Sequence, residues 1–436
     1  MGIPTIFPTG TTLHDPARSW KGYVLYGAPD GTTRLVDLEG NEVRSWSHLG
    51  FPSELIDPAV NQGRRGHVLV QLSKTLPDGR FGGIFDNESF GELDWDGQVV
   101  WKWGGEPENG PARQDHDWQK LPNGNLLFLS IVDRVVPGFS DKVVPDQRVR
   151  ELTPGGEVVW EWFVGDHFGE FGLSPRGLEV AREVAEGGRA GYGFLSINNL
   201  SVVGENHRFD AGDQRFHPEN FVIDSRNSNF VAIVDRRTGN VVWRIGPDYA
   251  DSSDESPSRL LNTRLPRPVD QLAGQHDAHV IPKGLPGAGN LLVFDNQGGS
   301  GFPHIALGIF AGSRVLEIDP VSKEIVWQYT AEDSGLPVWS FHSAFISSAR
   351  RLPNGNTLID EGQHGRIFQV TREGDVVWEY VNPIFGPIKV GVRQVRTNFT
   401  YRAQPVPYDW IPEGTPRGER AVVPPDPAAF RLPISD

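Results

Sequence analysis

The stretch DGQVVW at residues 96–101 decides the fold, because the chain repeats the same phrase six times. Each copy opens with a turn and continues as a short strand that ends on a tryptophan. Its period-2 alternation indicates a strand with one buried face. The six copies are GNEVRSW (40–46), DGQVVW (96–101), GGEVVW (155–160), TGNVVW (238–243), SKEIVW (322–327) and EGDVVW (373–378).

Two further strands precede each tryptophan strand. One is read in phrases such as TRLVDLEG (33–40) and RIFQVTREG (366–374), and another follows the turn LPNGN at 121–125 and again at 352–356. A strand ahead of the LPNGN turn makes four strands per unit. Six units of four antiparallel strands predict an all-β, six-bladed β-propeller, in which the four-stranded blades carry loop and short-helix insertions on one face. A solenoid is the rival, but it needs polar capping units at both ends.

The repeat predicts a single propeller domain over residues 1–411 and a Pro-rich, extended C-terminal tail over 412–436. The long intervals from Trp160 to Trp243 and from Trp243 to Trp327 indicate insertions of roughly 30 residues, which usually lie on one face. We expect the functional site on that face. Within the insertions, 174–188 has the caps of one short helix, whereas 247–275 and 296–312 read as irregular loops that are candidate lids.

Composition excludes several classes of protein. The net charge of −15 disfavours a nucleic-acid binder, which needs clustered Lys and Arg. No cysteine is present, so disulfides and thiolate-bound metals are excluded. No apolar run of about 18 residues exists, so no membrane partner is expected. Localisation stays unknown: the chain as it stands shows no signal peptide and reads as cytoplasmic, and it would be periplasmic if a leader had been removed.

Candidate catalytic residues lie on the innermost strands, because these strands line the propeller axis and bring residues of different blades together. Alignment on the LPNGN turn places His116 and His276 at equivalent positions, each in a His-Asp phrase. The blade between them offers Ser196 and Asn198 at a comparable point, and the next blade offers His342. The alternative is that these histidines are structural and bond across blades; for His342 the two readings are evenly balanced.

Two arginines suit an anionic ligand, because a guanidinium presents a planar fork of donors to sulfate, phosphate or carboxylate oxygens. Arg226 lies near the end of a predicted strand, and Arg402 lies close to the C-terminus. For both, the alternative is an inter-blade salt bridge. Gln275 and Asn296 complete the candidate substrate-binding residues, together with Ser196, His342 and Arg402.

The chain resembles the bacterial arylsulfotransferase family nearly end to end. That family moves sulfate from one phenol to another without a nucleotide sulfate donor. The resemblance is carried by TTLHDPARSWKGYVLYGAPDGTTRLVDLEG (11–40), HDWQKLPNGNLLFL (116–129), QHDAHVIPKGLPGAGNLLVFDNQGG (275–299), LPNGNTLIDEGQHGRIFQVTREGDVVWEYVNP (352–383) and NFTYRAQPVPYDW (398–410). It implies a six-bladed propeller, in agreement with the repeat count.

The resemblance also implies roles for individual residues. His276 matches the histidine that becomes transiently sulfated, His116 matches an assisting histidine, and Arg226 matches an arginine that holds sulfate oxygens. The family has His-x-Asn in the middle blade, whereas this chain has Ser196 followed by Ile197 and Asn198. The chain therefore keeps the asparagine of this phrase and lacks its histidine.

These observations predict an arylsulfotransferase-like enzyme acting on phenolic compounds or aryl sulfates, with His276, His116, Arg226 and Asn198 as catalytic residues and no cofactor. Hydrolysis of the same substrates is included in this hypothesis. The alternative is a metal-dependent lyase or hydrolase in which His116, His276 and His342 bind Zn²⁺ or Mn²⁺. A third hypothesis is a non-catalytic propeller that binds a partner or a glycan.

Overall fold

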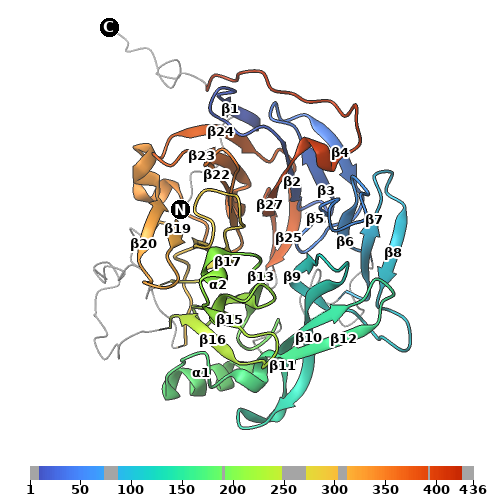
Figure 1. The fold of residues 1–436 in the computed structure, drawn as a ribbon, viewed down its shortest axis with the longest axis vertical. Helices are drawn as coiled ribbons and strands as arrows, with labels where there is room; N and C mark the ends of the chain where they lie inside the picture. Colours follow the sequence, from blue (N-terminus) through green and yellow to red (C-terminus); the bar gives the residue numbers. More distant parts are fainter. Residues whose placement is uncertain are drawn as a thin grey trace.

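The computed structural model describes residues 9–72, 87–188, 192–247, 272–302, 312–390 and 393–424. Six antiparallel sheets stand side by side around a central axis, so that the chain forms a closed ring (Figure 1). The predicted six-bladed β-propeller is confirmed. No helix in the described ranges is long and apolar enough to cross a membrane.

Each blade is named here by its strands from the axis outward. The first blade is β27 (Tyr401–Val406), β2 (Tyr23–Gly27), β3 (Thr33–Val36) and β4 (Glu42–Trp46). The second blade is β5 (Glu54–Leu55), β6 (Val68–Gln71), β7 (Phe90–Leu93) and β8 (Val99–Trp103). The third blade is β9 (Gln114–Lys120), β10 (Leu126–Val136), β11 (Ser140–Leu152) and β12 (Val158–Phe163). The fourth blade is β13 (Ile197–Val202), β14 (Phe221–Ser225), β15 (Phe230–Val234) and β16 (Val241–Ile245). The fifth blade is β17 (His276–Val280), β18 (Leu291–Asp295), β19 (Arg314–Ile318) and β20 (Ile325–Tyr329). The last blade is β21 (Ser348–Arg351), β22 (Thr357–Glu361), β23 (Arg366–Val370) and β24 (Val376–Val381).

Both ends of the chain help to close the ring. The late strand β27 pairs with β2, so the first blade takes its innermost strand from the C-terminal part of the chain. The early strand β1 (Gly10–His14) adds to the outer edge of β24 and makes the last blade five-stranded. The chain must therefore bring residues far apart in sequence together before the propeller is complete.

The repeated tryptophans tie neighbouring blades together. The indole N–H of Trp46 donates to Asp94 O at 3.0 Å, that of Trp327 to Arg372 O at 2.9 Å, and that of Trp378 to Leu38 O at 2.9 Å, in each case in the turn of the next blade. In the third blade Trp162 makes this bond, to Gly239 O at 2.9 Å. The turn of one repeat thus supplies the acceptor for the tryptophan of its neighbour, which explains why turn and tryptophan recur together.

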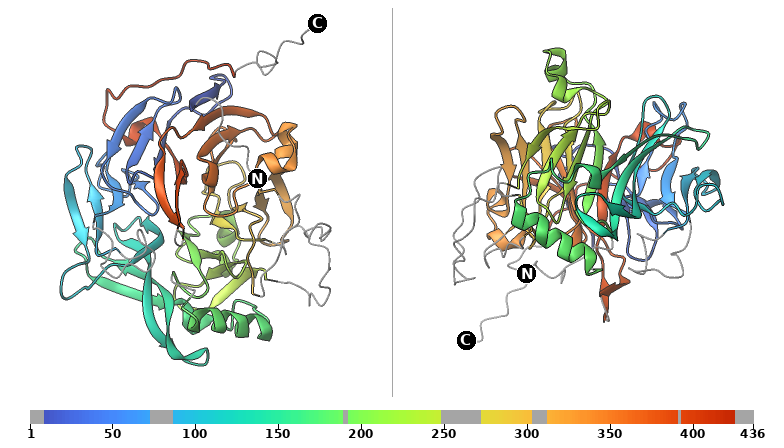
Figure 2. Two further views of the ribbon diagram at one scale, coloured as in Figure 1. Left: turned by 180° about the vertical axis from the view of Figure 1, so that it is seen from behind. Right: turned by 90° about the horizontal axis from the view of Figure 1, so that it is seen from below.

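The insertions lie on both faces of the ring. The helix predicted within 174–188 is α1 (Pro175–Glu186), whose N-cap Ser174 Oγ accepts from Gly177 N at 3.0 Å. It precedes β13 and so lies towards the face where the innermost strands begin. In contrast, α2 (His207–Asp210) follows β13 and lies towards the other face, while the hairpin β25 (Gly386–Val390) and β26 (Arg393–Thr397) leads into β27 (Figure 2). The prediction of a single insertion face is therefore wrong for the segment that holds α2.

The remaining regular elements are short 3₁₀ helices: η1 (Val164–His167), η2 (Gln214–Phe216), η3 (Ala331–Ser334), η4 (Val338–Ser340), η5 (Gly362–His364) and η6 (Tyr408–Trp410). After η6 the chain follows the outside of the first blade. There Tyr23 Oη donates to Pro416 O at 2.8 Å, and Arg420 pairs with Glu39 at 2.6 Å. Of the candidate lids, most of 247–275 and of 296–312 lies outside the described residues.

Candidate functional site

The innermost strands share a local distortion near the point where they begin. The pairing with the second strand slips by one residue in β13, β17 and β27 and by two residues in β9, which is the signature of a β-bulge or a related irregularity. Non-glycine residues with left-handed backbone lie at or just before these points and before β21: His116 (φ 48°), Ser196 (φ 55°), Asp277 (φ 60°), Ile346 (φ 56°) and Arg402 (φ 51°). Such conformations are uncommon and cluster at functional sites.

His276 is held in one tautomer at the start of β17. Its Nδ1 lies 2.7 Å from Asn296 Oδ1 and 2.9 Å from Gly274 O, and both of these atoms are acceptors. The Asn296 amide is itself oriented, because its Nδ2 donates to Ser343 O and Ile346 O. Nδ1 therefore carries the proton, and the lone pair is on Nε2, which accepts the backbone N–H of Ile346 at 3.1 Å.

The surroundings of His276 keep its imidazole neutral. The ring is 2% exposed, and burial lowers its pKa well below the ordinary range, with a further contribution from the positive charge of Arg226. His116, in the other His-Asp phrase, also contributes to the lowered pKa of His276. A neutral imidazole is the form that can act as a nucleophile.

The segment 343–347 closes over His276. Ile346 and Ser347 (φ 93°) are consecutive left-handed residues, and Ile346 is β-branched, so this backbone is strained. Hydrogen bonds hold it in place: Ser343 Oγ donates to Phe345 O at 2.8 Å and Gly362 N donates to Ser347 Oγ at 3.0 Å. The strained peptide thus presents its N–H to the one lone pair of His276.

His116 lies on the third blade with an acidic partner and an aromatic surround. Its Nδ1 is 2.5 Å from Asp115 Oδ1, and the other carboxylate oxygen of Asp115 accepts from Gln147. The Phe51 ring contacts the imidazole with centroids 4.9 Å apart, and the Tyr401 hydroxyl donates to His116 O at 3.0 Å. A carboxylate beside one ring nitrogen of an imidazole suits proton transfer.

Arg226 follows β14 and supplies a positive charge near His276. Its guanidinium donates to Asn227 Oδ1 at 3.1 Å and to Ala344 O at 3.4 Å. Burial lowers its pKa, and no described carboxylate offsets that effect. A half-buried guanidinium whose bonds within the described part of the chain are to neutral acceptors retains its attraction for an anion.

Tyr192 joins this group, although sequence reasoning missed it. Its ring meets the His116 ring edge-on, with centroids 6.0 Å apart and planes at 74°, and it interacts electrostatically with Arg226. Tyr192 belongs to the insertion between α1 and β13, which carries no repeat. No pattern in the sequence could therefore have identified it.

Arg402 forms an inter-blade ion pair. This is the alternative to anion binding that the sequence leaves open. It is 5% exposed, and its Nη1 lies 2.6 Å from Asp117 Oδ2 while its Nε lies 3.7 Å from Asp277 Oδ1. Nη2 donates to Asn198 O at 2.7 Å. Burial lowers the pKa of Arg402, but Asp117, Tyr401 and Asp277 together outweigh this effect and raise it overall. The guanidinium thus joins the first blade to the third, fourth and fifth.

Three other candidates, Asn198, Gln275 and Ser196, are fully buried, and the first two bond across blades. Asn198 Nδ2 donates to Gln275 O at 3.0 Å, and Gln275 Nε2 donates to Ser225 O and Phe230 O. Ser196 is also inaccessible to solvent. The contacts of Asn198 and Gln275 join the fourth and fifth blades, while Asn198 Oδ1, Gln275 Oε1 and Ser196 Oγ have no hydrogen-bond partner among the described residues.

The placement of His342 on an innermost strand is wrong. The innermost strand of the last blade is β21, which begins at Ser348, and His342 precedes it in the loop after η4. Burial lowers the pKa of His342, and the neighbouring histidine that adds to this effect is His364. Within the described ranges no three His, Asp or Glu side chains are grouped so as to hold a metal ion, and His116, His276 and His342 form no such group.

Glu54 of β5 lies in a second unusual electrostatic environment. Burial and the negative charge of Asp117 raise its pKa from 4.5 to about 8, against the opposing charges of Arg350, Arg402 and Lys120. Between these two pKa values the folded protein holds a proton that the unfolded chain has lost. The stability that this group contributes is therefore present at acid pH and lost as the pH rises to about 8.

Glu54→Gln removes this titration and keeps a neutral side chain. The melting temperature of the wild type, relative to that of the variant, is expected to fall as the pH is raised from about 5 to about 9, and to level off above that. Thermal unfolding followed by circular dichroism across this range measures the difference. A difference that stays constant with pH would contradict the raised pKa. Glu108→Gln, an exposed site, serves as the control.

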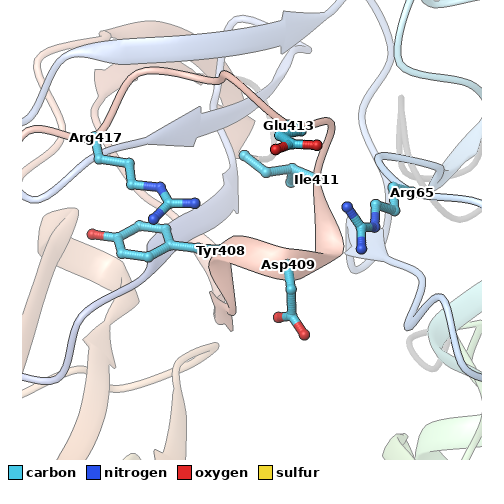
Figure 3. Close-up of a pocket in the computed structure, with 6 residues that line it drawn as sticks. All are labelled: Arg65, Tyr408, Asp409, Ile411, Glu413 and Arg417. Carbon is cyan, nitrogen blue, oxygen red and sulfur yellow. The ribbon is translucent and has the colours of Figure 1, made fainter.

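A separate hollow lies beside the C-terminal segment on the first blade. It has a volume of about 460 Å³ and is lined by Arg65, Tyr408, Asp409, Ile411, Glu413 and Arg417 (Figure 3). The guanidinium of Arg417 lies over the Tyr408 ring at 4.3 Å from its centre. The hollow contains none of the candidate site residues.

Comparison with solved structures finds distant similarity. A protein of unknown function from Bacteroides caccae is 12% identical with a TM-score of 0.45, covering 83% of this chain and 93% of that chain. A putative 6-phosphogluconolactonase from Bacteroides fragilis is 8% identical with a TM-score of 0.40, covering 92% and 99%. A catalytically inactive virginiamycin B lyase from Staphylococcus aureus, with quinupristin, is 11% identical with a TM-score of 0.39, covering 84% and 88%. No curated protein matches the sequence.

Comparison with protein families gives a direct assignment. The model of the arylsulfotransferase (ASST) family matches residues 89–383. This match runs from β7 to the end of β24 and contains His116, Arg226 and His276. Since it covers more than half of the sequence, the chain belongs to the arylsulfotransferase family.

Proposed function

We propose that this protein transfers a sulfuryl group from an aryl sulfate to a phenolic acceptor or to water, through a covalent intermediate on His276. Membership of the family supports transfer chemistry on aryl substrates. The observation that carries the finer proposal is the fixed tautomer of His276, which puts the lone pair on Nε2 beside an arginine without a carboxylate partner among the described residues.

In the first step Nε2 attacks sulfur, so that an N–S bond forms and the bond from sulfur to the aryl oxygen breaks. The electron pair of the broken bond leaves on the phenolate, and His116, in its protonated form, donates a proton to it. The N–H of Ile346 must leave the lone pair for this attack. It then lies beside the position that the sulfuryl oxygens take, where a backbone donor favours developing negative charge.

In the second step the neutral His116 removes the proton from the acceptor phenol or water. The acceptor oxygen attacks sulfur, the N–S bond breaks, and its electron pair returns to Nε2 of His276. Throughout both steps Asn296 holds Nδ1–H, and Arg226 faces the sulfuryl oxygens. General acid–base assistance of this kind contributes about 10²–10⁴-fold to the rate.

Rapid mixing with 4-nitrophenyl sulfate, followed by intact-protein mass spectrometry, tests the proposal. We expect a burst of nitrophenol equivalent to the enzyme and the added mass of one sulfuryl group, located on the peptide that contains His276. Addition of a phenol should discharge the modified protein. The wild type pretreated with a chelator is the control, because histidine chemistry needs no metal. Absence of phenol release across a panel of aryl sulfates would remove the proposal, and loss of release after chelation would favour the metal-dependent alternative.

A further inference from the structure

The turn that carries Tyr192 passes close to Gln147, the side chain that donates to Asp115 beside His116. A Cβ atom on Gly193 (φ 95°) would collide with the side chain of Gln147, so the chain passes closely over this glutamine. Gln147 Oε1 accepts from Ile197 N at 2.7 Å, and its Nε2 donates to Ile197 O and to Asp115. The turn that carries Tyr192 and the carboxylate that holds His116 therefore share one support.

The residues after Gly193 anchor this turn further. Phe194 N donates to Pro145 O at 2.9 Å, and the Phe194 ring stacks on Phe139 with centroids 4.2 Å apart. Ser196 N donates to Gly193 O at 3.1 Å, which closes the turn. These contacts fix where the insertion enters β13, and so restrict where the adjoining Tyr192 can lie.

The phenol of Tyr192 lies beside two groups of the proposed site. Its ring meets His116 edge-on, while Phe51 contacts the same imidazole at 4.9 Å between centroids. It also interacts electrostatically with Arg226, whose backbone N donates to Ser196 O at 3.0 Å. Tyr192 thus lies against one group of the proposed site, His116, and near a second, Arg226.

We propose that Tyr192 contacts the sulfuryl group directly and donates a hydrogen bond from its hydroxyl to a sulfuryl oxygen. This inference rests on the proposed function, because it names a further residue of that site. The hydroxyl transfers no proton. It acts by stabilising the negative charge that shifts among the sulfuryl oxygens as the N–S bond forms and the bond to the aryl oxygen breaks.

Tyr192→Phe tests the inference, because it removes the hydroxyl and keeps the ring against His116. With 4-nitrophenyl sulfate, kcat is expected to fall on the order of 10²–10³-fold with little change in KM, as on loss of one donor to a developing oxyanion. Binding of inorganic sulfate, measured by titration calorimetry, is expected to weaken roughly tenfold, as on loss of one charge-assisted hydrogen bond. Tyr408→Phe in the remote hollow is the matched control and should change neither quantity.

The two readouts separate this inference from the proposed function. If the wild type binds sulfate but releases no phenol, weaker sulfate binding in Tyr192→Phe supports the role of Tyr192 while sulfuryl transfer fails. If the wild type turns over and Tyr192→Phe leaves both kcat and sulfate binding unchanged, Tyr192 has no contact with the sulfuryl group and the inference is overturned. If the wild type neither binds sulfate nor turns over, both are overturned.

Discussion

Replacing Arg402 by methionine is expected to lower the free energy of unfolding by about 3–5 kcal/mol, the range measured when one partner of a buried ion pair is removed. The guanidinium pairs with Asp117 and approaches Asp277, and both carboxylates are buried. Without Arg402, these two carboxylates lie in the interior with less opposing charge. Urea unfolding followed by tryptophan fluorescence measures the loss.

The pH dependence of this loss identifies its cause. Burial raises the pKa of Asp117 and of Asp277, and the charge of Arg402 opposes that rise. In Arg402→Met both pKa values rise further. At acid pH the folded variant therefore binds protons on these carboxylates, which removes the buried negative charge. The loss of stability is therefore expected to be larger at about pH 8 than at about pH 5. A loss independent of pH would mean that packing, not charge, explains the effect.

Arg351→Met is the matched control for Arg402→Met. Arg351 is also buried, and its Nη2 lies 2.8 Å from Glu317 Oε2. Glu317 keeps a second partner, Arg372 at 3.3 Å, so removal of Arg351 leaves no carboxylate unpaired. We expect a clearly smaller loss of stability for this variant. An equal loss in both variants would contradict the central role assigned to Arg402.

The blades could be predicted from the sequence because their determinants are local. A turn, a period-2 strand and a terminal tryptophan recur with each blade, and short-range patterns of this kind identify strands. The bonds from the tryptophans to the next blade could not be predicted, since they join residues such as Trp378 and Leu38 across the closed ring. The opposite position of α2 was missed because repeat spacing does not reveal between which strands an insertion falls.

The site was only partly predictable, because the innermost strands are bulged. A bulge interrupts the alternation of side chains, so residue spacing no longer tells which side chain faces the axis. The side chains of Asn198 and Gln275 bond between the fourth and fifth blades. Arg402 pairs with Asp117 and approaches Asp277. The equivalence of His116 and His276 was visible because each stands in a His-Asp phrase at a fixed distance before the next turn.

Replacing His276 by asparagine is expected to lower kcat for phenol release by roughly 10⁴-fold or more, the scale seen when a covalent nucleophile is removed. No sulfuryl mass should appear on the variant. His279→Asn is the matched control, because His279 is also buried on β17 and burial also lowers its pKa well below the ordinary range, but its Nδ1 bonds Asp277 O. This control should keep its sulfuryl mass and its turnover.

His116→Asn separates the role of the assisting histidine from that of the nucleophile. If His116 protonates the departing phenolate, its loss should lower the rate by about 10²–10⁴-fold for a poor leaving group such as phenol and much less for 4-nitrophenol, which leaves readily without a proton. His276→Asn should be inactive with both substrates, because without the nucleophile no N–S bond can form, whatever the leaving group. If His116→Asn loses the same factor in rate with phenol and with 4-nitrophenol as leaving group, His116 is not the acid. If His276→Asn keeps full activity, the intermediate is not formed on His276.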